Sequence, residues 1–298
     1  MPSYLTGVLV AFIEPVAHAW SNVIDSNFSN HVFPKLSVLV FFGMVFNLVF
    51  LPFVIVVSHP HLLSFQLEGL IFCIALIEVL YLFPYYWSLR TTDTSIVASL
   101  FSLGEAAIPV LAFIFLHERL HAFQYVGFAI IIMSAIALTL DIKKLRFNRS
   151  FFLMLGASLI LAVEAILYKY IYLQGASWGS VVVPGTLFQI LIALPFALSA
   201  GKGALKDGFL KIRSVGKLYV INEFLGSAGN LSSSFAVFAL PVSIAKAISG
   251  SQPAFVLAYA YLFGGKNDFF KEGVSKREGV KKFFFFALTI VGTILVVA

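Results

Sequence analysis

Residues 102–113 read SLGEAAIPVLAF, and residues 249–260 read SGSQPAFVLAYA. Overlaid at an offset of 147 residues, the two stretches place Glu105 on Gln252, with small residues before both and an apolar run after both. The same offset relates other acidic residues to within a few positions: Glu14 falls near Glu164, and Glu78 falls near Glu223. A fixed period of this kind is the sign of an internal repeat. The chain is therefore predicted to consist of two related halves, residues 1–147 and residues 148–298.

The apolar content around these stretches is that of a membrane protein. Of the 298 residues, 60% are hydrophobic and only 11% are charged. In soluble domains, charged residues make up roughly a quarter of the sequence. Apolar runs near 20 residues can span a bilayer as helices. Ten such runs are predicted, at 4–24, 36–57, 67–89, 93–116, 121–141, 151–173, 178–199, 216–239, 241–263 and 281–298.

Each half contains five predicted helices, which is an odd number. The second half must therefore enter the membrane from the side opposite to the first. The sequence predicts an all-α integral membrane protein, with ten transmembrane helices arranged as two inverted-topology five-helix repeats. This architecture is common among transporters, which bind their substrates near the midplane.

Basic residues are strongly biased to one side of this topology. The loops after the first, third, fifth, seventh and ninth predicted helices hold Lys35, Arg90 and the basic clusters within 143–149, 202–217 and 266–282. The opposite side holds only Arg119. The positive-inside rule then places both termini outside. We expect a multi-pass protein of a bacterial or archaeal plasma membrane.

Several functional classes are disfavoured by composition and motifs. The net charge of +6 is explained by loop charge, so no nucleic-acid partner is expected. Cys73 is the single cysteine, which excludes an intramolecular disulfide and argues against a cysteine-based metal site. No glycine-rich phosphate loop occurs, and the HExxH outline at 117–121 falls at a turn without a third ligand. We predict no enzymatic activity, no metal and no cofactor.

Ionisable groups inside the predicted helices are the best candidates for function, because charges at mid-bilayer are costly. They concentrate in the first, third, fourth, sixth, eighth and ninth predicted helices, which should surround a central polar cavity. The other four helices should be peripheral, with Asn47, Gln124 and Gln189 as their main polar residues. The predicted substrate- or proton-binding residues are Glu14, His18, Glu78, Glu105, Glu164, Glu223, Asn230, Lys246 and Gln252.

Each of these residues also has a purely structural interpretation. A buried glutamate can stay protonated and hydrogen-bond a neighbouring helix. Lys246 can contact an anionic substrate group or pair with a glutamate, and His18 can join two helices or relay protons. Lys169, near a helix end, is expected to snorkel to the interface.

The run Ser99-Leu-Phe-Ser-Leu-Gly-Glu105, followed by Phe115-Leu-His-Glu118-Arg-Leu, resembles the EamA-type signature of the drug/metabolite transporter superfamily. Glu105 and Glu118 match the first copy of the pattern, although Ala106 replaces its proline and His117 its glycine. Gln252-Pro253 and Gly264-Gly265 match the second copy, which here lacks both glutamates. The resemblance covers the whole chain as two halves.

This resemblance implies ten helices, a central cavity and secondary transport, often export, of amino acids or related metabolites. Family members are commonly drawn with both termini in the cytoplasm, which is opposite to the charge pattern here, so the direction of transport stays open. We therefore expect an alternating-access transporter of small polar metabolites, with proton coupling as one option. The partners would be a small-molecule substrate and the lipid bilayer, and the protein a monomer or a homodimer. The alternative is a flippase for a lipid-linked metabolite or a non-transporting membrane protein.

Overall fold

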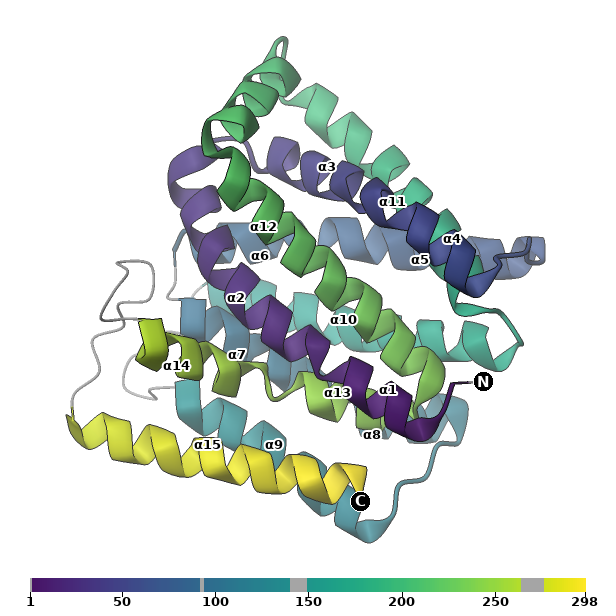
Figure 1. Ribbon diagram of the computed structural model, residues 1–298, viewed down its shortest axis with the longest axis vertical. Coiled ribbons are helices and arrows are strands. Elements are labelled where there is room, and N and C mark those ends of the chain that lie inside the picture. Colours follow the sequence, from purple (N-terminus) through teal and green to yellow (C-terminus); the bar gives the residue numbers. More distant parts are fainter. Residues whose placement is uncertain (1, 92–93, 140–148, 264–275) are drawn as a thin grey trace.

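The protein is helical throughout the part of the chain that the structure describes. The computed structural model describes residues 2–91, 94–139, 149–263 and 276–298. Figure 1 shows the helices packed side by side, with no strand among these residues. Their bounds are α1 (Tyr4–Ala11), α2 (Ile13–Asn27), η1 (Phe28–Val32), α3 (Leu36–Phe46), η2 (Asn47–Phe50), α4 (Leu51–Ser58), α5 (Phe65–Leu80), α6 (Leu82–Leu89), α7 (Thr94–Glu105), α8 (Ile108–Leu116), α9 (Ala122–Thr139), α10 (Arg149–Leu173), α11 (Trp178–Ser199), α12 (Ala204–Ala239), α13 (Val242–Ser249), α14 (Gln252–Phe263) and α15 (Lys276–Val297).

Five helical stretches in the described residues are long and apolar enough to cross a membrane. They are Tyr4–Val32, Leu36–Ser58, Phe65–Leu89, Arg149–Leu173 and Trp178–Ser199. Shorter apolar helices cover Leu100–Leu116, Ala122–Ala137 and Phe284–Val297. Every predicted range overlaps a helix, but that all ten cross the bilayer stays a prediction.

Three helices extend further than hydropathy predicted. The first continues through η1 to Val32, α12 begins at Ala204 rather than near 216, and α15 begins at Lys276 rather than near 281. The added turns of α12 carry lysines among apolar residues. A helix can leave the hydrocarbon without ending, because its backbone hydrogen bonds are internal. Hydropathy marks only its apolar part.

The breaks within several predicted helices lie two to five residues before a proline. Proline lacks the N–H that would bond the carbonyl four residues earlier, and its ring crowds that carbonyl. The pairs of break and proline are Phe12 with Pro15, η2 with Pro52, Tyr81 with Pro84, residues 106–107 with Pro109, and residues 250–251 with Pro253. The breaks before Pro109 and Pro253 directly adjoin Glu105 and Gln252, the two residues that the repeat aligned.

Three of the loops predicted to share the basic side, those after the first, third and seventh predicted helices, lie together in the structure. Lys35 donates a hydrogen bond to the carbonyl of Ala200, and Arg90 donates one of 2.6 Å to the carbonyl of Phe33. At the opposite end, the Tyr4 hydroxyl donates a 3.2 Å bond to the carbonyl of Val297. The two termini are therefore neighbours, as Figure 1 shows. The basic residues Lys143, Lys144, Arg146, Lys266 and Lys271, with Gly264 and Gly265, lie outside the described residues.

Helices α9 and α15 pack against each other along one edge of the molecule (Figure 1). Their backbones meet at two glycines: a Cβ on Gly127 would lie 2.6 Å from the carbonyl oxygen of Gly292. Small residues allow this close approach, which favours helix association in lipid. Among the side chains that the structure describes, those of α9 and α15 do not line the cavity described below.

The exterior of the helices is apolar. Val56, Phe65 and Phe123 are 71%, 93% and 73% exposed, and many other large hydrophobic side chains share this exposure. A contiguous surface of this kind is unfavourable in water. Together with the apolar helices, it identifies an integral, multi-pass membrane protein.

Candidate functional site

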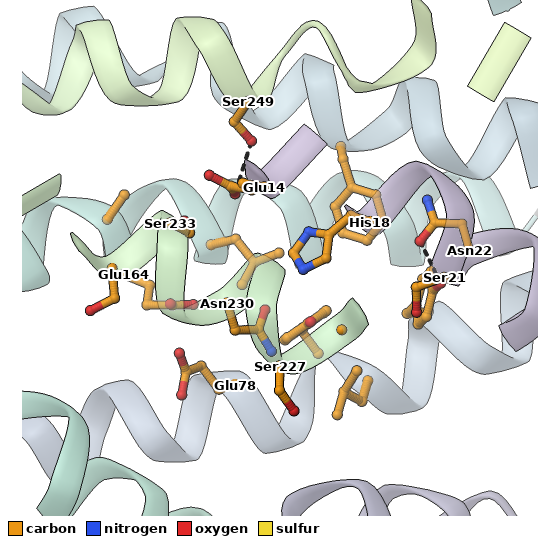
Figure 2. Close-up of a pocket in the computed structure, with 18 of the residues that line it drawn as sticks. Glu14, His18, Ser21, Asn22, Glu78, Glu164, Ser227, Asn230, Ser233 and Ser249 are labelled. Carbon is orange, nitrogen blue, oxygen red and sulfur yellow. Dashed lines mark hydrogen bonds between the residues drawn. The ribbon is translucent and has the colours of Figure 1, made fainter. Parts of the chain in front are cut away.

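A polar cavity of about 210 Å³ lies between the helices. At about 30 Å³ per water molecule, this volume suits a small metabolite. The structure places all nine predicted site residues around this one cavity: Glu14, His18, Glu78, Glu105, Glu164, Glu223, Asn230, Lys246 and Gln252. Figure 2 shows several of them converging from different helices.

The prediction of which helices line the cavity needs one correction. Helices α3 and α11 belong to the set expected to be peripheral, yet Gly43 and Met44 of α3 and Gln189 of α11 line it. Asn47, at the start of η2, also lines it. These helices carry no charged residue in their spans, so a prediction based on charge could not place them. Their role depends on small and neutral polar residues.

Lys246 is held by a buried ion pair. Its Nζ lies 3.0 Å from Glu14 Oε1 and 2.6 Å from the Ser233 hydroxyl. Ser249 donates a further 2.9 Å hydrogen bond to Glu14 Oε1. Of the two expectations for Lys246, pairing with a glutamate is the arrangement seen here. The pair joins α2 to α13 across the cavity.

A second cluster centres on the carboxyl group of Glu78. The Tyr168 hydroxyl donates a 2.8 Å hydrogen bond to Glu78 Oε1, and the Gln189 amide donates to Oε2. Glu164 lies close enough to Glu78 for their side chains to hydrogen-bond. Two carboxyl groups in contact repel each other when both are ionised. This pair is therefore suited to hold a proton or a cation.

A third cluster, around Asp25, was not predicted from the sequence. The Asn222 amide donates a 2.8 Å hydrogen bond to Asp25 Oδ1. The Tyr85 hydroxyl lies 3.0 Å from Asp25 Oδ2 and 2.8 Å from Asn22 Oδ1, and its single proton can be donated to either oxygen. Asp25 was missed because the first span was predicted to end at residue 24. The signal was present, since Asp25 continues the polar stripe of Glu14, His18 and Asn22 by one helical turn.

Glycines bring two side chains close to neighbouring helices. A Cβ on Gly43 would lie 3.1 Å from Glu223 Oε2, so α3 presents bare backbone to that carboxylate. The His18 ring occupies the place where Gly229 would carry a Cβ. His18 also hydrogen-bonds Asn230 and the backbone of Gly226. It thus joins α2 to α12, in the cavity wall.

Replacement of Gly229 by alanine should displace His18 and destabilise the protein. Overpacking of this kind costs about 1–3 kcal/mol, which corresponds to a melting temperature lower by roughly 2–12 °C. The matched control is Gly226→Ala in the same helix, where the added Cβ would lie 3.7 Å from the Ser21 hydroxyl, an ordinary contact. Thermal unfolding in detergent measures both. Equal melting of the two variants would contradict the close packing of His18 on Gly229.

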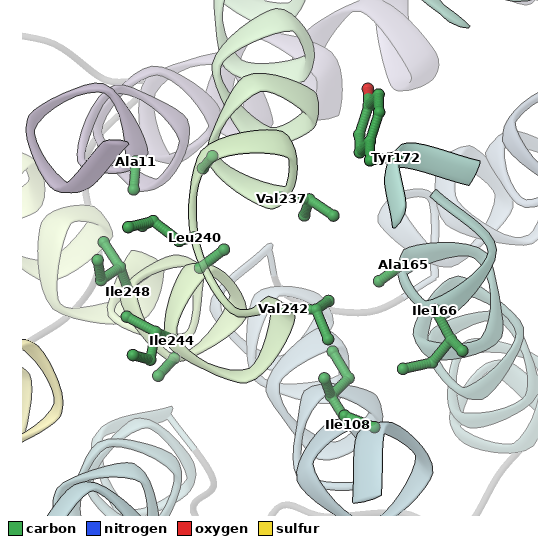
Figure 3. Close-up of a cluster of buried hydrophobic side chains, with 14 of the residues drawn as sticks. Ala11, Ile108, Ala165, Ile166, Tyr172, Val237, Leu240, Val242, Ile244 and Ile248 are labelled. Atoms are coloured by element: carbon green, nitrogen blue, oxygen red, sulfur yellow. The ribbon is translucent and has the colours of Figure 1, made fainter. Parts of the chain in front are cut away.

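The junction between α12 and α13 is held by two charged side chains. Glu118 accepts hydrogen bonds of 2.9 Å from the Val242 N–H and 3.0 Å from the Ser243 N–H, at the start of α13. Lys169 donates to the carbonyls of Val237 and Leu240, at 3.0 and 2.6 Å. Lys169 thus finds acceptors at the last carbonyls of α12, and that it snorkels to the interface stays a prediction. Apolar side chains enclose the junction (Figure 3).

Comparisons with known proteins match the first half of the chain to a family. The sequence model of the EamA-like transporter family matches residues 5–140. No curated protein matches the chain in sequence. Among 29 solved chains that match, a crystal structure described only as that of a protein has a TM-score of 0.65 and 14% sequence identity, with 98% of each chain covered. At this identity the likeness concerns the fold alone.

Proposed function

We propose that the chain is a secondary transporter of small polar metabolites, such as amino acids or amines, in the drug/metabolite transporter superfamily, because its residues 5–140 match the sequence model of the EamA-like transporter family. It works by alternating access and is coupled to protons. The observation that carries the proposal is the cavity itself. Six carboxyl groups, those of Glu14, Asp25, Glu78, Glu105, Glu164 and Glu223, line it inside the helical bundle. Charges at this depth are costly and are retained for a function.

The proposed architecture is ten membrane crossings in two inverted halves, residues 1–147 and 148–298. The helix contacts support it. Helix α7 of the first half packs on α10 of the second half, and α14 of the second half packs on α2 of the first half. In the predicted repeat, the first span (with α2) corresponds to the sixth (α10), and the fourth (with α7) corresponds to the ninth (with α14). The contact of α7 with α10 is therefore the counterpart of the contact of α14 with α2. Neighbouring termini agree with an even number of crossings.

Within this proposal the residues have distinct tasks. Glu14, Glu78, Glu164 and Glu223 bind protons or cations, and Asn230 and Gln252 orient the substrate by hydrogen bonds. The contact between Glu78 and Glu164 is the best candidate for the coupling proton, since a shared proton relieves their repulsion. Lys246 balances Glu14.

The test is transport by the purified protein in liposomes. The vesicles are loaded with an equimolar mixture of amines, amino acids and nucleosides, a pH gradient is imposed, and the contents are followed by mass spectrometry. We expect at least one class to cross severalfold faster than in protein-free vesicles, and faster with the gradient than without it.

Glu78→Gln should remove the acceleration by the gradient and leave gradient-independent exchange, because the amide keeps the shape but cannot bind a proton. The matched control is Glu68→Gln, in the first turn of α5 and away from the cavity lining. If no class crosses faster than in protein-free vesicles, with or without a gradient, secondary transport is excluded.

The alternative, a flippase for a lipid-linked metabolite, requires polar groups that are open to lipid. Glu14, Asp25 and Glu164 are each less than 9% exposed, which favours a soluble substrate.

We further propose a bacterial or archaeal plasma membrane with both termini outside. Labelling by a membrane-impermeant maleimide tests this in a Cys73→Ala background: a cysteine at Ser3 should react in intact cells, and one at Lys202 only after permeabilisation.

A further inference from the structure

Three buried oxygens in the cavity wall accept no hydrogen bond from the described residues. They are Glu14 Oε2, Glu164 Oε2 and Gln189 Oε1. Glu14 and Glu164 are only 5% and 8% exposed, so bulk water does not solvate them freely. Buried polar atoms normally have partners. Among the unpartnered buried atoms of the lining residues, these three acceptors outnumber one donor, Asn22 Nδ2, so a ligand that brings hydrogen-bond donors is favoured.

The charged groups of the cavity also favour a ligand that brings hydrogen-bond donors. Six carboxyl groups line it, and Lys246 is the one ammonium group among the lining residues that the structure describes. Lys246 is already engaged by Glu14 and Ser233. A carboxylate or phosphate on the ligand would thus face six carboxyl groups and no available cation. A ligand of positive charge is favoured.

Aromatic rings form part of the wall beside these acceptors. Tyr81, Tyr85 and Phe101 all line the cavity, with ring centroids 6.3 Å apart for Tyr81 and Phe101 and 5.6 Å apart for Tyr85 and Phe101. Tyr81 lies within electrostatic range of Glu164 and Glu78. Aromatic faces attract ammonium groups, and more strongly where water is excluded.

We infer that the substrate is an organic amine that carries no carboxylate. Its ammonium group donates to Glu164 and Gln189, and its apolar body lies against Tyr81 and Phe101. An ammonium group has three donors and no acceptor, which is the complement of the three unpartnered oxygens. This inference rests on the proposed function and narrows its substrate class, because amino acids and nucleosides are then excluded.

Three probes that share one ring and differ in charge test the inference by calorimetry on the purified full chain. They are phenethylamine, a cation; phenylalanine, a zwitterion; and 3-phenylpropionate, an anion. We expect phenethylamine to bind at least tenfold more tightly than phenylalanine, which is about 1.4 kcal/mol, and no measurable binding of the anion. Equal or tighter binding of phenylalanine or 3-phenylpropionate overturns the inference, as does the absence of saturable binding by both phenethylamine and hexylamine.

Variants locate the amine in the cavity. Glu164→Gln and Tyr81→Leu should each weaken phenethylamine binding about tenfold or more, whereas Tyr81→Phe, which keeps the ring, should retain most of it. The matched control is Phe83→Leu, in the same helix as Tyr85 but outside the cavity lining. Equal loss in Phe83→Leu and Tyr81→Leu would show that the aromatic wall does not hold the amine.

The inference and the proposed function can fail separately. If liposomes carry amino acids and the protein binds them, transport stands and the amine specificity is wrong. If amines bind with the expected pattern but nothing crosses the membrane, the cavity is an amine site and the transport proposal is wrong.

Discussion

The Lys246→Met protein is expected to melt far below wild type and to recover much of the loss when Glu14 is also replaced by glutamine. In wild type the Lys246 ammonium group lies 3.0 Å from Glu14 Oε1. Removal of one partner leaves the other charge buried without compensation, which costs about 3–5 kcal/mol. This corresponds to a drop in melting temperature of roughly 6–20 °C. Methionine keeps most of the apolar stem, so lost packing contributes little.

The double variant tests whether the loss of stability comes from the unpaired Glu14 carboxylate. If the cost comes from an unpaired carboxylate, Glu14→Gln should stabilise the Lys246→Met background although it destabilises wild type. Lys202→Met serves as the control, since Lys202 is exposed in the loop before α12, and should leave the melting temperature unchanged. Additive losses in the double variant would mean that the two residues are not energetically coupled.

The Glu118→Ala protein is expected to lose about 3 kcal/mol, because the start of α13 would have no acceptor for its N–H groups. Pro241 precedes α13 and provides no side-chain cap, whereas Glu118 accepts from both Val242 and Ser243. A carboxylate at a helix N-terminus is also favoured by the helix dipole. Amide hydrogen exchange should rise over Val242–Ser249, and the melting temperature should fall.

Two further variants bracket this effect. Glu118→Gln retains one acceptor and should lose about half as much as alanine. Glu68→Ala removes a carboxylate that accepts one long hydrogen bond, 3.4 Å from the Leu63 N–H, and should cost less than about 1 kcal/mol. Unchanged exchange over α13 in Glu118→Ala would show that the junction is held by its apolar surroundings instead.

Features that depend on one stretch of sequence were predictable. Apolar runs located the helices, and charged residues within those runs identified Glu14, Glu78 and Glu164, which the structure brings to one cavity. Hydropathy could not find the start of α12, because a helix that enters water keeps its hydrogen bonds but loses its apolar signal. It also cut the first helix one residue short of Asp25.

Features that depend on partners distant in sequence were not predictable. Lys169 bonds carbonyls 68 and 71 residues away, and Glu118 bonds amides 124 and 125 residues away. Each residue alone is equally compatible with a position at the membrane interface. The acceptor that a lysine binds depends on the packing of α8, α10 and α12. That packing cannot be predicted by inspection of a single sequence.

The glycine contact between α9 and α15 has a consequence for how the protein is made. Thr139 ends α9, and its partner begins only at Lys276. At about 5–20 residues per second, the ribosome needs roughly 7–27 s to reach the partner helix. During this interval the face of α9 around Gly127 is open to lipid and to other nascent helices. Insertion of α15 is thus a late step of biosynthesis, at which this edge of the first half becomes covered.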